Sequence, residues 1–343
     1  MSSPFFAPRV RTAARPARIG FLGVGWIGRH RMRAMLDSGQ IEAAAIADPS
    51  GDMLEAARQL APAAEAATDL DGLLTHDLDG VVIATPSALH AQQALQALEA
   101  GIAVFCQKPL GRSAREVEAV VAAANAGDRL LGVDLSYRRT DGMQRIKDLL
   151  RNGDLGEVFA ADLIFHNAYG PDKPWFYDKA LAGGGCVMDL GVHLIDLALW
   201  ALDYPEVAHV ASSLMAGGRP LEADASAVED YALATLTLAQ GTVIRVACSW
   251  RLQAGCEAVI GASFYGTSGG AAMHNVDGSF YTFTADRFHG IKRETLAGPE
   301  NDWGGRAATD WARQLNDNPR FDNDCRHLVE VARVLDQIYG RDG

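Results

Sequence analysis

Short apolar runs alternate with amphipathic stretches between residues 18 and 136. Runs of this length, bounded by glycine, proline and aspartate, are typical of strands, and the stretches between them have the spacing of helices. This alternation predicts a doubly wound α/β domain, in which a parallel sheet is covered by helices on both faces. The predicted strands are 18–22, 42–48, 80–86, 103–107 and 130–135, and the predicted helices run to Ser38 after the first strand and over 52–60, 88–100 and 113–126.

The pattern changes after about residue 156, where longer strand-like runs appear, and Gln240-Gly241 between two of them indicates a hairpin. These runs predict an α+β domain with a large, mainly antiparallel open sheet. A length of 343 residues also favours about two domains. The predicted organisation is a flexible tail at 1–17, a dinucleotide-binding domain at 18–136, and a substrate-binding and oligomerisation domain at 137–343.

Composition excludes several classes of protein. The formal net charge is −12, which disfavours nucleic acid and anionic membranes as partners. No apolar run reaches the roughly 18 residues of a spanning helix. Five scattered cysteines without a C-x-x-C favour a reducing cytoplasm over disulfides or a zinc site. The first 17 residues lack the apolar core of a secretory signal, and the alternative to a mobile tail is an arm that contacts a neighbouring subunit.

A glycine-rich turn follows the first predicted strand and opens a helix. Its sequence is Gly23-Val-Gly25-Trp26-Ile27-Gly28, the spacing of a dinucleotide-binding turn. The first glycine permits the tight turn, the second admits a pyrophosphate, and the third lets helix and strand pack closely. The N-terminus of the helix supplies N–H donors for the phosphates. This segment therefore predicts a dinucleotide cofactor.

Asp48 ends the second predicted strand, 20 residues after Gly28. A carboxylate there accepts hydrogen bonds from the adenosine ribose and repels a 2′-phosphate, which favours NAD over NADP. The alternative is that Asp48 and Pro49 only form a turn.

Two later segments carry candidate catalytic residues. Lys108 lies at the carboxyl end of a predicted parallel strand, where cofactor sites of such sheets are found. It is one of only five lysines. Asp189 and His193 follow a run of three glycines at a spacing of four, which places both on one face of a helix.

With these segments the chain resembles the Gfo/Idh/MocA family of oxidoreductases. The resemblance runs over about residues 18–200. Beyond the glycine turn, it rests on Thr85-Pro86 with His90, on the segment from Ala100 to Pro109, on Tyr137-Arg138-Arg139, on Asp154-Leu-Gly156-Glu157, and on the Gly183–Asp196 stretch. It implies NAD held by the glycine turn, Asp48, Thr85, Pro86, His90, Gln107 and Lys108, with Lys108, Asp189 and His193 as the catalytic trio.

One position departs from the family pattern. The family usually has glutamate before the lysine, and this chain has Gln107. An amide keeps the size and hydrogen-bonding capacity of the side chain but removes a negative charge. Because glutamine occurs in some relatives, the change does not indicate loss of function.

The trio suits hydride transfer from a secondary alcohol. His193 is the candidate base, because the ordinary pKa of imidazole lies near neutrality. Asp189 would orient the imidazole, and Lys108 would stabilise developing negative charge on the substrate oxygen. The alternative makes Lys108 the proton acceptor and His193 a positioning group. A purely structural Asp189–His193 pair is a further alternative.

Other candidates have open alternatives. His90 lies under the cofactor or is a cap or core histidine, and Trp175 lines a substrate pocket or only packs. Arg138 is a candidate for binding a substrate carboxylate. No metal is expected, although Asp189, His193 and Asp196 share one helix, because the set lacks a thiolate or second histidine at ligand spacing. Asp196 is expected to hydrogen-bond within the fold.

The predicted function is therefore an NAD-dependent dehydrogenase acting on CH–OH groups of a small polyhydroxylated substrate: a sugar, a glycoside or a cyclitol such as inositol. Two alternatives remain. The first is redox-assisted glycoside cleavage or epimerisation with tightly bound NAD, and the second is a non-catalytic ligand sensor. A broad sheet without helices on both faces also predicts a homodimer or homotetramer.

Overall fold

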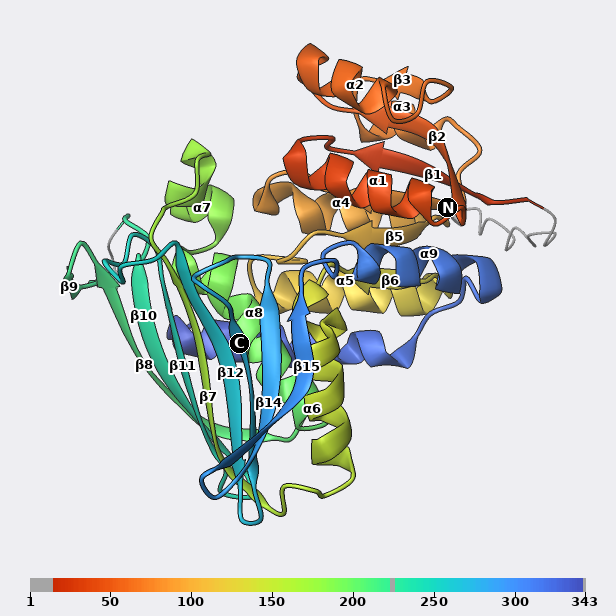
Figure 1. Cartoon of the computed structure of the whole chain (residues 1–343). Helices are drawn as coiled ribbons and strands as arrows, with labels where there is room; N and C mark the ends of the chain where they lie inside the picture. Colours follow the sequence, from red (N-terminus) through yellow and green to blue (C-terminus); the bar gives the residue numbers. More distant parts are fainter. Residues whose placement is uncertain (1–14, 223–225, 342–343) are drawn as a thin grey trace. The chain divides into compact units, whose positions relative to one another are not determined.

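The computed structural model describes residues 15–222 and 226–341. The chain forms two compact units, which are described separately (Figure 1). The first comprises residues 1–111, 115–134 and 305–326, and the second comprises 112–114, 135–304 and 327–343.

The first unit contains a six-stranded parallel sheet with the order β3-β2-β1-β4-β5-β6. This is the strand order of dinucleotide-binding sheets. The predicted doubly wound α/β domain is therefore confirmed. The strands are β1 (Ala17–Leu22), β2 (Ile41–Ala47), β3 (Glu65–Ala67), β4 (Gly80–Ile83), β5 (Ala103–Cys106) and β6 (Leu131–Val133). The helices are α1 (Trp26–Asp37), α2 (Gly51–Arg58), α3 (Leu70–Leu74), α4 (Ser87–Glu99), α5 (Ala114–Gly127) and α9 (Arg306–Asp317).

Both faces of this sheet are covered, which explains why its strands are apolar throughout. Every residue of β4 and of β5 is buried. In β1 the side chain of Ile19 lies in one core with α1 and α9. A Cβ on the next residue, Gly20, would instead meet Leu73 of α3 at 3.6 Å. Since successive strand residues point to opposite faces, α9 and α3 lie on opposite sides of the sheet.

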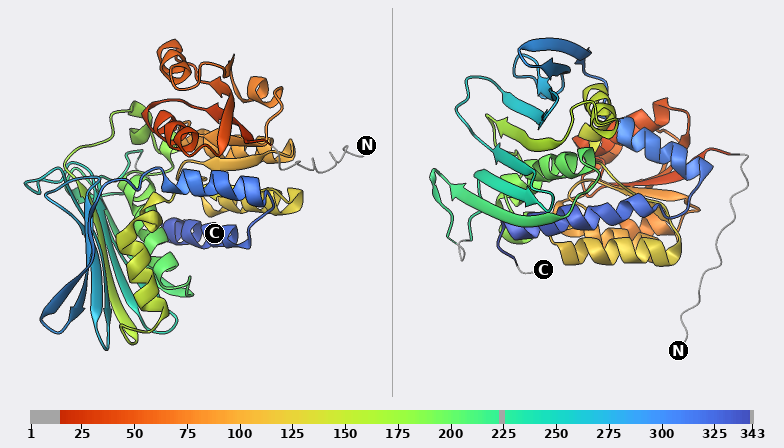
Figure 2. Two further views of the ribbon diagram at one scale, coloured as in Figure 1. Left: turned by 45° about the vertical axis from the view of Figure 1, so that its right-hand side comes forward. Right: turned by 90° about the horizontal axis from the view of Figure 1, so that it is seen from below.

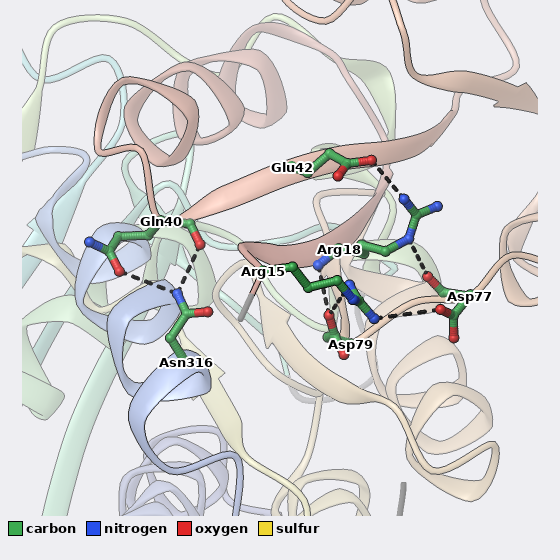
Figure 3. Close-up of polar contacts among 7 residues, drawn as sticks. All are labelled: Arg15, Arg18, Gln40, Glu42, Asp77, Asp79 and Asn316. Atoms are coloured by element: carbon green, nitrogen blue, oxygen red, sulfur yellow. Dashed lines mark hydrogen bonds and ion pairs between the residues drawn. The ribbon is translucent and has the colours of Figure 1, made fainter. Parts of the chain in front are cut away.

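Helix α9 corrects the predicted domain boundary, because it was expected in the domain over 137–343 and packs in the first unit instead. Its Trp311 ring lies 5.6 Å from that of Phe105. Gly80 and Gly132 make room for the indole, since a Cβ on either would come within 2.6 Å of it. Asn316, also on α9, donates to the carbonyl of Gln40 at 2.8 Å (Figure 3). Helix α9 thus covers part of one face of the first sheet, although it lies far from the strands of that sheet in the sequence.

The predicted tail over 1–17 falls mostly on residues 1–14, which lie outside the described residues. Sheet structure begins at Ala17, which is fully buried. Asp79 holds this start of β1, because it accepts from the backbone N–H of Arg18 at 2.8 Å and from the Arg15 guanidinium at 3.0 Å (Figure 3).

The second unit contains a nine-stranded sheet with the order β15-β14-β13-β12-β7-β11-β10-β8-β9. Only the β7–β11 pair is parallel, so the predicted, mainly antiparallel sheet is confirmed. The strands are β7 (Val158–Asn167), β8 (Val207–Ala216), β9 (Arg219–Pro220), β10 (Tyr231–Leu238), β11 (Val243–Ser249), β12 (Ala258–Gly266), β13 (Gly270–Asn275), β14 (Phe283–His289) and β15 (Lys292–Glu300). The predicted hairpin at Gly241 joins β10 to β11.

Helices cover one face of this second sheet (Figures 1 and 2). The principal ones are α6 (Asp141–Arg151), α8 (Val192–Ala201) and α10 (His327–Ile338). In β10 every second side chain is buried and the others are half-buried, which is the pattern of a sheet with one packed face. The helical stretch Lys179–Ala201 has the length and hydropathy of a membrane span, but 78% of its most apolar window is buried, so it packs as the core helix of this unit.

Candidate functional site

The glycine-rich turn has the geometry that its three glycines predict. Gly23 has a φ of +82°, and a Cβ there would lie 2.5 Å from the carbonyl oxygen of Ala84. A Cβ on Gly28 would lie 2.1 Å from the carbonyl oxygen of Gly23. A Cβ on Gly25, by contrast, would meet nothing within 4 Å. The first and third glycines are thus required by packing, and the second faces open space where a pyrophosphate can approach.

The same turn presents the start of α1. Gly25 precedes the helix and contributes no side-chain cap, so N–H groups of the first turn remain available to an anion. Trp26 is 62% exposed and Ile27 is half-buried. These features fit the phosphates of a dinucleotide.

Asp48 follows β2, and its carboxylate is hydrogen-bonded to the backbone of the glycine turn. Its Oδ2 accepts from the backbone N–H of Val24, and its Oδ1 accepts from that of Ser50, both at 2.9 Å. Asp48 therefore does form a turn with the residues after it, which was the alternative to a ribose-binding role. The predicted ribose role is compatible with it, because each carboxylate oxygen has a second lone pair and the residue is half-buried.

His90 lies in the core beneath the loop after β4. It is 1% exposed, and its two ring nitrogens lie 2.7 Å from the carbonyl oxygens of Pro109 and Thr85. Burial lowers the pKa of His90, against the raising effect of these two carbonyl contacts. The histidine thus links the loop of Thr85 and Pro86 to the loop of Lys108. His90 is therefore a core histidine, and a position beneath the cofactor stays a prediction.

Gln107 and Lys108 follow β5 as predicted. Gln107 is 7% exposed, and Lys108 is half-buried and precedes a cis bond to Pro109. The Gln107 amide donates to Asp134, which lies after the neighbouring strand β6. The carboxyl ends of β4 and β5 therefore carry Thr85, Pro86, Gln107 and Lys108, four of the residues predicted to hold the cofactor.

The glycines before Asp189 pack closely against two residues that the sequence did not indicate, Glu229 and Tyr339. A Cβ on Gly184 would lie 2.0 Å from the Tyr339 hydroxyl, and one on Gly185 would lie 1.9 Å from the carbonyl oxygen of Glu229. The Glu229 Oε1 accepts from the backbone N–H groups of Gly185 and Val187 at 2.9 Å each, and from Tyr339 at 2.7 Å.

Burial raises the pKa of Glu229, against the lowering effect of these hydrogen bonds. The side chain anchors the start of the helix that carries Asp189 and His193. Nothing in the local sequence around Glu229 indicates this role, because its partners lie more than 40 residues away in the chain.

Asp189 and His193 share one face of that helix, as predicted. The segment Val187–Gly191 is a π-helical turn that continues directly into α8. Within 187–199, only Asp189 and His193 are not buried. The indole N–H of Trp250 donates to the Asp189 Oδ2 at 3.1 Å, and the ring of Tyr137 lies edge-on to His193 at 5.0 Å. Aromatic side chains therefore fix the surroundings of both residues.

Arg138 forms an ion pair within the second unit. Its guanidinium makes a bidentate pair with Asp196 of α8, with a distance of 2.7 Å from Nε to Oδ2. Asp196 is 2% exposed, and a buried carboxylate requires such a partner. Asp196 thus hydrogen-bonds within the fold as expected, and substrate binding by Arg138 stays a prediction. Trp175 is half-buried and stacks on Phe176 at 3.8 Å, so it packs locally.

No group of three or more His, Cys, Asp or Glu side chains that could hold a metal ion occurs within residues 15–222 and 226–341. Asp189, His193 and Asp196 accordingly do not form such a group.

Comparison with known proteins matches each of the two units to a family model. Residues 17–135 match the model of the oxidoreductase family with an NAD-binding Rossmann fold, and residues 143–272 match that of the GFO/IDH/MocA C-terminal domain. Among curated proteins, inositol 2-dehydrogenase 4 of Saccharopolyspora erythraea is 28% identical over 334 residues, which cover 93% of this chain and 86% of that protein. D-glucoside 3-dehydrogenase of Escherichia coli is 28% identical over 211 residues, which cover 59% of this chain and 60% of that protein.

The chain aligns with only part of the length of the first curated relatives. The aligned segments span 60%, 38% and 54% of the length of the first three curated relatives. Among solved structures, levoglucosan dehydrogenase in complex with NADH and levoglucosan has a TM-score of 0.80 at 20% identity, covering 95% of this chain and 97% of that one. GenD2 in complex with NAD has a TM-score of 0.78 at 24% identity, covering 98% and 96%. At this identity the structural likeness concerns the fold.

Proposed function

Since the chain belongs to the Gfo/Idh/MocA family of oxidoreductases, we propose that it transfers a hydride between NAD and a secondary alcohol or ketone of a sugar, glycoside or cyclitol. The observation that carries the proposal is that Asp189 and His193 are half-buried along an otherwise fully buried helical stretch, 187–199. A buried helix that keeps an acid and an imidazole partly accessible is suited to proton transfer. The names of the relatives support the substrate class, because they include inositol and glucoside dehydrogenases.

The cofactor role falls to the first unit. Gly23, Gly25 and Gly28 shape the turn that would receive the pyrophosphate, with Trp26 and Ile27 at its helix. Asp48 would accept from the ribose hydroxyls, and its charge disfavours the extra phosphate of NADP. Bound NAD supplies the hydride acceptor. Thr85, Pro86, Gln107 and Lys108 are proposed to flank the nicotinamide, with His90 supporting their loops from within the core.

The chemical roles follow from the acid–base properties of the side chains. In the proposed oxidation, His193 takes the hydroxyl proton as the carbon loses its hydride. Asp189, held by Trp250, orients the imidazole and stabilises its charged form. Lys108 donates a hydrogen bond to the substrate oxygen. The competing assignment gives the proton to Lys108 and leaves His193 as a positioning group.

The proposal is tested by supplying sugars, glycosides and inositols with NAD or NADP and following absorbance of the reduced cofactor. We expect net reduction of NAD with at least one polyol and slower reduction of NADP, because of Asp48. Substrate turnover without net reduced cofactor would instead support redox-assisted cleavage or epimerisation. Ligand binding without turnover would support a sensor.

We further propose a homodimer or homotetramer in the cytoplasm. On one face of the second sheet, Val243, Ala160 and Tyr265 lie in one row across the strands, and Val243 and Tyr265 are 42% and 38% exposed. Large exposed apolar side chains in one row are often covered by a partner. Sedimentation at micromolar concentration should give a stable oligomer, and a monomer would contradict the assignment. The five cysteines are all free thiols, which suits a reducing compartment.

A further inference from the structure

The carboxyl ends of β5 and β6 are joined by a buried cluster of three side chains, Arg31, Gln107 and Asp134. The Asp134 Oδ2 accepts from the Gln107 Nε2 and from the Arg31 Nε, each at 2.5 Å. The exposed fractions are 7% for Arg31, 7% for Gln107 and 2% for Asp134. The three residues come from α1, from the end of β5 and from the end of β6, so the cluster connects the helix of the glycine turn to the loop of Lys108.

The charges of the cluster explain the residue found at position 107. Arg31 and Asp134 supply one positive and one negative charge, and Gln107 is a neutral donor. A glutamate at 107 would place a second carboxylate against the Asp134 oxygen in a buried site, where like charges cannot both remain ionised without a large cost. A neutral amide at position 107 is therefore compatible with the carboxylate at position 134, and a second carboxylate is not.

The cluster also fixes the backbone that leads into Lys108. The Asp134 N–H donates to the Cys106 carbonyl at 2.9 Å, and the Gln107 N–H donates to the Ile83 carbonyl at 2.8 Å. Gln107 is thus held by its main chain and by its side chain. On the far side of Lys108, the carbonyl of Pro109 is held by His90. The backbone is therefore held on both sides of Lys108.

We propose that Asp134 carries the negative charge of the Lys108 loop in this chain and, acting through Gln107, positions Lys108. Asp134 is a positioning residue, and Arg31 keeps its charge compensated in the core. The importance of this for catalysis rests on the proposed function, in which Lys108 binds the substrate oxygen. The charged and titratable groups around the cluster include Arg31, Asp134, Lys108 and His30, whose Nδ1 lies 2.8 Å from the Arg31 Nη1. They also include the buried Cys106, whose pKa is raised by burial first and then by Asp134, and the buried His90, whose pKa is lowered by burial first and by Lys108 to a smaller extent.

The test exchanges the two side chains. Three variants are compared with the native protein: Gln107→Glu, Asp134→Asn and the double variant. Each single change upsets the charge balance beside Arg31, and we expect its melting temperature to fall by about 6 °C or more, as for a broken buried ion pair in a protein of this size. The double variant again has one carboxylate and one amide beside Arg31, so it should regain most of the loss. Asp148→Asn is the matched control, because it breaks an exposed Arg–Asp pair with Arg151.

The effect on Lys108 is read without any substrate. Lysine amines are trace-labelled with acetic anhydride across a pH series and quantified by peptide mass spectrometry, with Lys147, Lys173, Lys179 and Lys292 as internal references. Because Asp134 holds the Gln107 side chain next to Lys108, Asp134→Asn should loosen this turn and increase the labelling of Lys108 relative to the four reference lysines at each pH. The double variant should restore the native labelling, and the four reference lysines should not change.

Two results would overturn the proposal. Additive losses of stability in the double variant would show that positions 107 and 134 are not partners. An unchanged Lys108 profile in all variants would show that the cluster is structural only. If no polyol is oxidised by the native protein, the proposed function fails, but both measurements still decide the role of Asp134. If Asp134→Asn alone does not fold, the melting temperatures of Gln107→Glu and of the double variant are compared instead. A double variant that is more stable than Gln107→Glu would still show that the two positions are partners.

Discussion

Replacement of His193 by asparagine should lower kcat at least about 100-fold, which is the usual contribution of a general base. Asparagine keeps a hydrogen-bonding group of similar reach but cannot take up a proton near neutral pH. The imidazole lies on a helix that is otherwise buried around it, beside the Tyr137 ring, so the substitution changes little packing. Steady-state oxidation of the best polyol found with NAD is the measurement.

The pH dependence of this variant separates the two assignments of the proton acceptor. If His193 is the base, the acidic limb of the kcat profile disappears in His193→Asn. If Lys108 is the base, the variant keeps that limb and loses rate only through poorer positioning. His289→Asn is the matched control, because His289 is exposed at the end of β14 of the same unit and should keep full activity. Retention of kcat within a few-fold by His193→Asn would contradict both roles.

Replacement of Gly25 by alanine should abolish tight cofactor binding without damaging the fold. A Cβ at this position meets no protein atom within 4 Å, and the backbone φ of −58° suits any residue. The added methyl group would occupy the space needed by the pyrophosphate. We expect NAD to bind at least about tenfold more weakly, a loss of about 1.4 kcal/mol or more. The melting temperature should stay within about 2 °C of the native value.

Two other glycines serve as comparisons for Gly25. In Gly28→Ala the Cβ would lie 2.1 Å from a backbone oxygen, so the melting temperature itself should fall by about 5 °C or more. Gly51→Ala, at the first residue of α2, adds a methyl group to open space away from the turn and should change neither property. Calorimetric titration with NAD and thermal unfolding provide both values. Native-like NAD affinity in Gly25→Ala would show that the pyrophosphate does not pass over this glycine.

The local sequence was sufficient wherever an element is defined by its own periodicity. The predicted strand at 18–22 corresponds to β1, and the strand over 103–107 corresponds to β5. The hairpin at Gly241 and the long strand β7 were also predicted correctly. Parallel strands buried on both faces are uniformly apolar and short, so they are distinct from helices even in a single sequence.

Elements that depend on distant partners were missed. Strands β13 and β15, which are stabilised by pairing within the second sheet, were not predicted. The residues of α9 fell in the predicted domain over 137–343 and belong to the first unit, because an amphipathic helix carries no information about which sheet it will cover. The spaces above Gly80 and Gly132 that accept Trp311 exist only after the first sheet has formed.

The same division holds for the site. By itself, the sequence determined the family resemblance, the dinucleotide turn, the lysine after β5 and the shared face of Asp189 and His193, because each depends on spacing within one short segment. Only the tertiary structure decided that Arg138 is committed to Asp196, that Glu229 anchors the catalytic helix, and that Gln107 faces a carboxylate. These are pairings of buried polar groups across 27 to 58 residues of chain, and burial obliges such groups to find partners wherever the fold brings them together.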